Sequence, residues 1–290
     1  MSQKNNPKKY EHFIPQLYLK FFSPDGNMVY QYRVKSHSPS KLVPIKTICY
    51  KKHLYELKND NNEFICRNMI ENTFEKYEGE FANVIRSIIS KSKHESNYQI
   101  PCFLSTDEKM FLIFLVATTI LRSPRLLKIA KDTVLDAAQK DGKNISVNTA
   151  HNSALLSCLP FVNVIEGRSD SILDRIIDKL MDMAFLIGVT NDDSFFTSDN
   201  PIFWHGNNET FDIEEVIFPL TPNIVLFMYP VDQMPRMFRN RVIHLTNIEV
   251  KDVNYRIILF CRDWLFSKKE IKNNQINVIE QIKEEQNVVL

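Results

Sequence analysis

A chain of 290 residues with 44% hydrophobic content can bury a core without help from disulfides or metal ions. Its formal net charge is +1, which argues against a protein that coats nucleic-acid backbones, although a local basic groove stays open. Only six dispersed glycines occur, which argues against the glycine-rich phosphate loops of P-loop and dinucleotide-binding enzymes.

The cysteines and apolar segments indicate where the protein resides. The five cysteines are scattered singly and form no CxxC pair, so neither a zinc ribbon nor a thioredoxin-type redox centre is indicated. The N-terminal segment is polar and lacks the apolar stretch of a signal peptide. The most apolar run, residues 111–121, is too short to cross a bilayer. We therefore expect a soluble, cytoplasmic protein with reduced thiols and no membrane partner.

The first part of the chain predicts a strand and then helices. Turn residues at 23–27 precede an alternating pattern over 28–35, which is the period of a half-buried strand. An apolar stripe with spacings of three and four residues predicts a helix over 70–90. Ser105 and Glu108 have the spacing of a capping box, which predicts the start of a second helix.

Pro124 is expected to end or kink that second helix. Ser123 is placed to cap the next helix, which should run through about Gln139. A further amphipathic helix is predicted over 171–186.

The pattern beyond Gly188 returns to strands. They are predicted over 194–197, 202–204, 216–218 and 224–229. Thr246 and Glu249 repeat the capping-box spacing before a helix whose apolar stripe extends to Leu265. Strands, then helices, then strands indicate an α+β fold, with a mixed or antiparallel sheet of N- and C-terminal strands around a central helical block. We expect one domain over 1–268, and a polar helix or tail over 269–290.

His12 is the first candidate for chemistry. It lies in His-Phe-Ile-Pro, where a rigid proline and close aromatic residues would hold the imidazole in one orientation. A general base or a metal ligand needs that constraint. The alternative is a semi-buried histidine bonded to a backbone carbonyl.

Three acidic residues lie on the helix predicted over 70–90. Glu71 and Glu78 are two turns apart and fall about 20° apart around the helix axis, with Glu75 between them. Carboxylates at the edge of a core could bind Mg²⁺ or Mn²⁺. The alternative is an amphipathic helix that simply has acidic flanks.

Arginines and a turn supply the remaining candidates. Arg122 and Arg125 flank the predicted helix break and suit a phosphate or carboxylate, while a salt bridge to one of the glutamates is the structural alternative. Asp199 and Asn200 precede a proline after a predicted strand, so they are either catalytic or simply turn formers. Arg236 and Arg239 flank Phe238 in the most basic segment, which suits a nucleotide or a solvated loop.

Five stretches resemble, in the same order, motifs of the uncharacterised bacterial family catalogued as domain of unknown function 4238. The stretches are His-Phe-Ile-Pro from position 12, Ile-Glu at 70 with Glu78, Arg-Ser-Pro at 122, Thr-Ser-Asp-Asn-Pro at 197 and Pro-Leu-Thr-Pro at 219. The resemblance covers residues 12 to about 260. Lys20 departs from it, because the family more often carries an arginine there, and a lysine would bind an anion less well.

The resemblance implies a set of polar residues that suits a metal-assisted phosphodiester hydrolase, with a nucleic acid or nucleotide as substrate. In this hypothesis Glu71, Glu78 and Asp199 hold Mg²⁺ or Mn²⁺ and His12 is the base or a further ligand. Arg122 steadies phosphate charge. Asn200 completes the catalytic group, and the substrate-binding residues are Lys20, Arg125, Arg236 and Arg239.

Such a hydrolase would suit a toxin-like or phage-defence effector. Two alternatives stay open: a binding or scaffold protein whose polar motifs are structural, and a metal-free enzyme that processes nucleotides such as NAD. The oligomeric state is not predicted.

Overall fold

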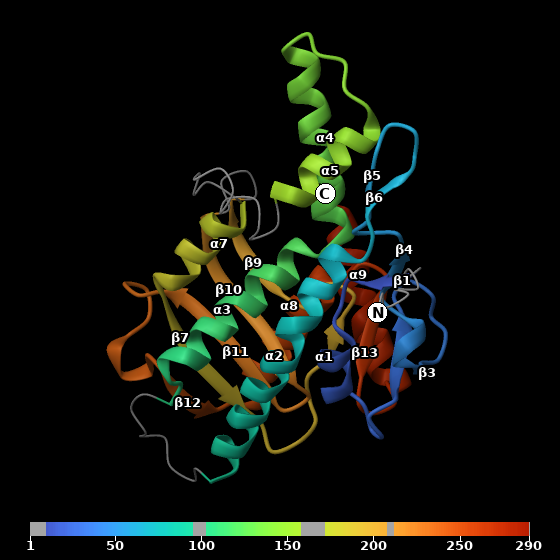
Figure 1. The fold of residues 1–290 in the computed structure, drawn as a ribbon. Coiled ribbons are helices and arrows are strands. Elements are labelled where there is room, and N and C mark those ends of the chain that lie inside the picture. Colours follow the sequence, from blue (N-terminus) through green and yellow to red (C-terminus); the bar gives the residue numbers. More distant parts are fainter. Residues whose placement is uncertain (1–9, 95–102, 158–171, 208–211, 290) are drawn as a thin grey trace, which may run out of the picture.

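The computed structural model describes residues 10–94, 103–157, 172–207 and 212–289 (Figure 1). The strands are β1 (Tyr10–His12), β2 (Met28–Arg33), β3 (Lys41–Pro44), β4 (Tyr50–Lys52), β5 (Leu57–Lys58), β6 (Phe64–Cys66), β7 (Met183–Val189), β8 (Thr197–Ser198), β9 (Phe203–Asn207), β10 (Asp212–Thr221), β11 (Ile224–Pro230), β12 (Arg241–His244) and β13 (Trp264–Ser267). The α-helices are α1 (Gln16–Phe21), α2 (Met69–His94), α3 (Thr106–Leu121), α4 (Pro124–Lys140), α5 (Val147–Ser157), α7 (Ile172–Met181), α8 (Asn247–Phe260) and α9 (Asn273–Val289). Two short 3-10 helices are η1 (Ile45–Thr47) and η2 (Arg236–Phe238).

A five-stranded sheet forms the centre of the molecule, in the order β12-β7-β11-β10-β9. Its neighbours are antiparallel, except that β12 runs parallel to β7. Strand β7 is buried over nearly its whole length, because it has a strand on each side and side chains packed on both faces.

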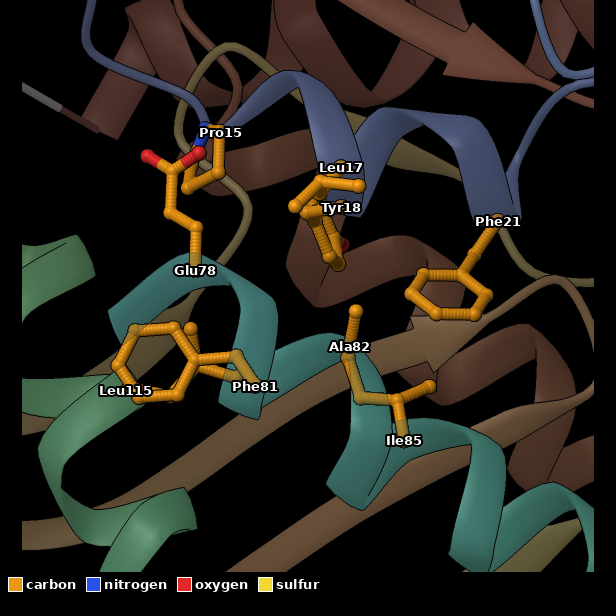
Figure 2. A pocket seen from close by; sticks show the side chains of 9 residues that line it. All are labelled: Pro15, Leu17, Tyr18, Phe21, Glu78, Phe81, Ala82, Ile85 and Leu115. Atoms are coloured by element: carbon orange, nitrogen blue, oxygen red, sulfur yellow. The ribbon is translucent and has the colours of Figure 1, made fainter. Parts of the chain in front are cut away.

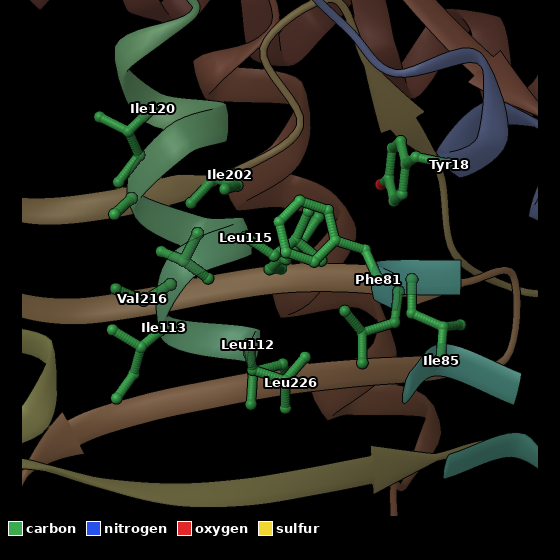
Figure 3. Close-up of a cluster of buried hydrophobic side chains, with 14 of the residues drawn as sticks. Tyr18, Phe81, Ile85, Leu112, Ile113, Leu115, Ile120, Ile202, Val216 and Leu226 are labelled. Atoms are coloured by element: carbon green, nitrogen blue, oxygen red, sulfur yellow. The ribbon is translucent and has the colours of Figure 1, made fainter. Parts of the chain in front are cut away.

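Two hydrophobic cores lie on opposite faces of this sheet. Because successive side chains of a strand point to opposite faces, Val216 and Phe218 belong to one core and Ile217 to the other. Helices α1, α2, α3 and α7 cover the first face and α8 and α9 the second (Figure 1). Figure 3 shows Leu112 of α3 packed close to Leu226 of the sheet.

A four-stranded sheet joins the two ends of the chain, in the order β3-β2-β13-β8. Strand β2 pairs with β13 from Arg33↔Trp264 to Tyr30↔Ser267. This pairing confirms the predicted α+β fold, in which N- and C-terminal strands share a sheet around a central helical block. Two small ribbons, β1-β4 and β5-β6, complete the strand pairing of the described residues.

The predicted helix starts are confirmed. Ser105 and Glu108 form a reciprocal capping box at the start of α3, and Thr246 and Glu249 do so at α8. The helix break also lies where Pro124 predicts it, with a 65° bend between α3 and α4. Ser123 precedes α4 as expected, but its hydroxyl accepts a hydrogen bond from Arg262 and does not cap the helix.

Two predicted helices extend too far. The helix predicted over 171–186 ends at Met181, and the residues from Met183 onward form β7. The helix predicted to Leu265 ends at Phe260, and Leu265 lies in β13. Both errors have one cause: a short strand buried on both faces has a continuous apolar run that periodicity does not separate from a helix. The four strands predicted beyond residue 190 correspond to β8, β9, β10 and β11 with shifted ends.

The C-terminal segment is a helix. Ile276, Ile279 and Ile282 of α9 are buried in the second core. Lys283 is 4% exposed and donates hydrogen bonds to the carbonyls of Leu259 and Cys261, so it satisfies carbonyl groups at the end of α8. Helix α9 spans Asn273–Val289, within the segment predicted to be a polar helix or tail.

In the described part of the chain, no single helix has the length and apolarity to cross a membrane. Helices α3 and α4 have the length and apolarity of a membrane span only when they are taken together across their 65° bend.

Two glycines provide a test of this packing. A Cβ on Gly188 in β7 would lie 2.8 Å from Leu245 Cδ1 and 2.8 Å from Phe227 Cε2, whereas a Cβ on Gly79 in α2 has nothing within 4 Å. We expect Gly188→Ala to lower the free energy of unfolding by about 1–3 kcal/mol through overpacking. Gly79→Ala should raise it by about 0.5–1 kcal/mol. Urea unfolding of both variants measures this, and a neutral Gly188→Ala would contradict the described core.

Candidate functional site

The site is built around Arg122, the residue that ends α3. Its side chain is 2% exposed. Nη1 lies 2.8 Å from Glu78 Oε1, Nη2 donates to the carbonyl of His12 at 2.7 Å, and Glu71 Oε2 is 4.0 Å away. The guanidinium also stacks over the ring of Phe74, 4.2 Å from its centroid. Burial opposes the charge, but Tyr55, Glu78 and Glu71 outweigh it and raise the pKa of Arg122.

Helix α2 supplies the two glutamates that meet Arg122. Glu71 lies in its first turn, where the helix dipole favours an acidic side chain. Glu78 follows two turns later on the same side, as the sequence predicts, and both carboxylates face the guanidinium. Glu75, one turn after Glu71, is exposed. The salt-bridge alternative for Arg122 is therefore present in the structure.

Two further glutamates lie beside this group. Glu11 of β1 is 0% exposed, and Glu56 between β4 and β5 is 1% exposed. Glu11 Oε2 accepts a hydrogen bond from the Tyr55 amide at 2.8 Å, and Glu56 Oε1 accepts one from the Asn68 amide at 3.2 Å. The second oxygen of each carboxylate is buried without a hydrogen bond in the described part of the chain. Neither glutamate forms an ion pair there.

The pKa of Glu11 is raised to about 7. Burial is the main cause, and the charges of Glu56 and Glu71 add to it, against the hydrogen bond from Tyr55. Glu11 therefore exchanges its proton near neutral pH. We call the five residues Glu11, Glu56, Glu71, Glu78 and Arg122 the carboxylate–arginine centre.

His12 touches this centre through its backbone. Arg122 contacts the His12 carbonyl, while Nδ1 of the ring lies 3.3 Å from Nε2 of Gln16. The ring packs edge-on against Tyr50, 5.6 Å between centroids. The His-Phe-Ile-Pro segment thus holds the histidine in one place, as the sequence predicts, with its carbonyl directed at the arginine.

Asp199 and Asn200 make a different set of contacts. Both oxygens of Asp199 accept backbone hydrogen bonds, from Arg262 at 2.9 Å and Asp263 at 3.0 Å. Asn200 Nδ2 donates to the carbonyl of Phe260 at 3.1 Å. Burial raises the pKa of Asp199 against the hydrogen bonds from those two amides. These contacts join the end of α8 to the start of β13, and Arg262 extends them to Ser123.

The basic substrate-binding candidates form no hydrogen bond or ion pair with the centre in the described part of the chain. Lys20 and Arg125 are exposed at the end of α1 and the start of α4. Arg239 donates to the carbonyls of Met234 and Val231, inside its own loop.

Arg236 and Arg239 lie near the opposite end of α3 from Arg122. Their loop is held by Asn240 at Leu104, just before the helix starts, whereas Arg122 ends it. Sixteen residues of helix span about 24 Å, so these arginines lie a helix length from Arg122.

Two small hollows flank the centre. One lies between α1, α2 and α3 and is lined by Pro15, Tyr18 and Glu78, among apolar neighbours; Figure 2 shows the Glu78 carboxylate beside Pro15. The other reaches Tyr55 and Arg122 from the side of Phe74 and α4. Each has room for about one water molecule.

No group of three or more His, Cys, Asp or Glu residues within the described ranges has the arrangement of a metal site. A cation at the centre would therefore need ligands besides protein side chains. Mg²⁺ commonly has this kind of site, with one or two carboxylates, waters and substrate phosphate oxygens.

Sequence reasoning missed Glu11, Tyr55 and Glu56. Glu11 directly precedes the His-Phe-Ile-Pro motif, so its position next to a constrained segment was the available signal. Tyr55 and Glu56 lie in a short irregular connection, where no periodicity indicates burial.

Comparison with known proteins identifies the family. No curated protein and no solved structure matches the chain. The model of the family described as "Protein of unknown function (DUF4238)" matches residues 10–270, which includes every residue of the carboxylate–arginine centre. Since this match covers most of the sequence, the chain belongs to the DUF4238 family.

Proposed function

We propose that the protein is a hydrolase that cleaves phosphodiester bonds of nucleic acids or nucleotides at the carboxylate–arginine centre. One observation carries the proposal: Glu71 and Glu78 face one buried arginine, and two further buried glutamates, Glu11 and Glu56, lie beside Glu71 without a cation of their own in the described part of the chain. Buried carboxylates in excess of their cations need a proton or a metal ion to balance them. A structural salt bridge alone would need one carboxylate for one guanidinium.

A divalent cation, Mg²⁺ or Mn²⁺, is the partner that we propose for this excess charge. Glu71 and Glu78 would hold it, because hard cations prefer carboxylate oxygens. The cation would supply Lewis-acid polarisation of a phosphoryl oxygen. We leave Asp199 out of the ligand set, since both its oxygens already accept backbone hydrogen bonds.

The chain's own residues would have two further roles. Arg122 is held rigidly by Glu78 and the His12 carbonyl, so it is placed to stabilise phosphate charge without reorganising. Glu11 would hold or release a proton near neutral pH, which is the property of a general acid or base. Access would be through the hollow that Glu78 lines, the outer edge of the centre.

A binding or scaffold protein is the second candidate. This candidate is favoured by the poor accessibility of the centre: Arg122 is almost wholly buried, and the adjoining hollows are small. In that case the polar motifs serve the fold, and no substrate would be turned over.

We expect purified protein to cleave RNA, single-stranded DNA or a nucleotide in the presence of Mn²⁺. Glu71→Gln and Glu78→Gln should each reduce turnover by roughly 10²-fold or more, because each removes a negative ligand at the centre. Glu75→Gln is the matched control, an exposed glutamate on the same helix, and should keep full activity. The readout is product release measured with Mn²⁺ and with EDTA.

The other outcomes of this assay are decisive. Turnover of NAD that EDTA does not inhibit would replace the metal-assisted mechanism with the metal-free one. Inert wild-type protein over the whole substrate panel would contradict the hydrolase and favour the scaffold.

The raised pKa of Glu11 predicts a pH dependence of stability. The folded carboxyl binds its proton more tightly than the unfolded one, whose ordinary pKa is 4.5. The stabilisation that protonated Glu11 contributes to the free energy of unfolding is therefore fully present below about pH 4.5 and is lost as pH rises through about 7. Glu11→Gln, which cannot ionise, should show a smaller loss of unfolding free energy between pH 5 and pH 8 than the wild type. Urea unfolding at both pH values measures this, and equal losses would contradict a protonated Glu11.

A further inference from the structure

Three cations that form no ion pair with the described residues lie on the surface beside the carboxylate–arginine centre. Lys52 ends β4, Lys58 ends β5, and Arg67 follows β6. All three act on one imidazole: burial lowers the pKa of His53, and the charges of Lys52, Lys58 and Arg67 lower it further, against Glu56. The three cations are therefore close together. We call Lys52, His53, Lys58, Phe64 and Arg67 the β4–β6 patch.

An aromatic ring lies within this patch. The Arg67 guanidinium is 3.9 Å from the centroid of Phe64, and Lys58 Nζ is 5.1 Å from it. His53 packs against the same ring, with 5.1 Å between the centroids. A stacked guanidinium keeps its donors free at the edge, where it can bind a phosphate in a bidentate manner.

The cations of the patch have no acidic partners within the described ranges. Lys52, Lys58 and Arg67 form no ion pair there. The nearby acidic side chains are bound otherwise: Asp60 accepts from Ser146 and Thr149, and Glu63 accepts from Asn59. Nδ1 of His53 is also buried without a hydrogen bond in the described part of the chain.

Helix α5 holds the patch in shape. Asn152 binds the backbone of Lys58 on both sides, accepting from its amide at 3.2 Å and donating to its carbonyl at 2.7 Å. Asn148 donates to the Asn59 carbonyl and to the Asn62 side chain, which fixes the turn between β5 and β6. Figure 1 shows this hairpin beside α4 and α5. Because the hairpin is already held in place, little conformational entropy would be lost when a ligand binds to it.

We propose that the β4–β6 patch binds the phosphate backbone of a single-stranded nucleic acid, RNA or DNA. Two cations at an aromatic ring, with Lys52 next to the histidine that packs on that ring, match the combination that holds single strands, where cations follow the phosphates and planar groups contact the bases. The patch also adjoins the centre through Tyr55 and Glu56, two of the residues between His53 and Lys58. The inference rests on the proposed function, because it supplies the substrate-binding surface of that hydrolase.

Binding is measured by fluorescence anisotropy with labelled U20 and dT20, in EDTA so that metal-dependent turnover is absent. Three phosphate contacts give a slope of about −2 in log affinity against log salt, or roughly 20-fold weaker binding between 50 and 200 mM KCl. The triple variant Lys52→Gln, Lys58→Gln, Arg67→Gln should bind about tenfold or more weakly and lose this slope.

Two further variants keep the test decisive. Lys41→Gln, Lys251→Gln, Lys269→Gln removes the same charge from exposed lysines on β3, on α8 and after β13, and should bind as the wild type does. Lys52→Arg, Lys58→Arg, Arg67→Lys keeps the charge of the patch and should retain binding. If it does, weaker binding by the glutamine variant is due to lost charge and not to a damaged hairpin.

The outcomes of these measurements separate the binding surface from the proposed hydrolase. No binding of either oligonucleotide, undiminished binding by the glutamine variant, or equally tight binding of a duplex would overturn the inference. Preference between U20 and dT20 identifies which strand is the ligand. Binding through the patch without hydrolysis in Mn²⁺ would reject the proposed function alone, whereas hydrolysis that is unaffected by the glutamine variant would reject the patch alone.

Discussion

One guanidinium joins segments that are far apart in the sequence. Arg122 ends α3, where the helix dipole favours a cation, and from there it binds the His12 carbonyl and Glu78. Its own carbonyl accepts a hydrogen bond from the Tyr55 hydroxyl. The N-terminal ribbon, the connection at 55 and the helices α2 and α3 therefore share one buried charged residue. Burying that charge is costly unless its partners stay in place, so the position of each segment depends on the others.

The contacts of Arg122 form a first network, and a second network of hydrogen bonds begins at the next residue, Ser123. Ser123 binds Arg262, and Asp199 holds the amides of Arg262 and Asp263. Through these bonds the break between α3 and α4 is tied to β13, which pairs with β2 near the N-terminus. Most family motifs thus have a contact in one of these two networks. The network around Arg122 contains more carboxylates than one salt bridge requires. This excess of carboxylates is the reason for treating it as a candidate site and not only as a structural salt bridge.

The sequence predicted what is local and missed what depends on distant packing. Both capping boxes were found, because a serine or threonine and a glutamate three residues later determine a helix start by themselves. The shared face of Glu71 and Glu78 followed from helix geometry. The first half of β7, up to Leu186, falls within a predicted helix, because burial of this strand on both faces is decided by β11 and β12 and leaves no alternation. Burial of Glu11 and Glu56 could not be foreseen, since short ribbons carry no pattern that indicates which side faces the core.

The most direct test of the central claim is a double-mutant cycle at Arg122. Arg122→Met should lower the free energy of unfolding by about 3–5 kcal/mol in the wild-type background, because it leaves the carboxylates of Glu71 and Glu78 buried without their cation. In a Glu71→Gln, Glu78→Gln background the same substitution should cost about 1–3 kcal/mol less, which is the coupling expected within one charged network. A loss below about 1 kcal/mol, or an equal loss in both backgrounds, would show that Arg122 does not hold these segments together through its charge.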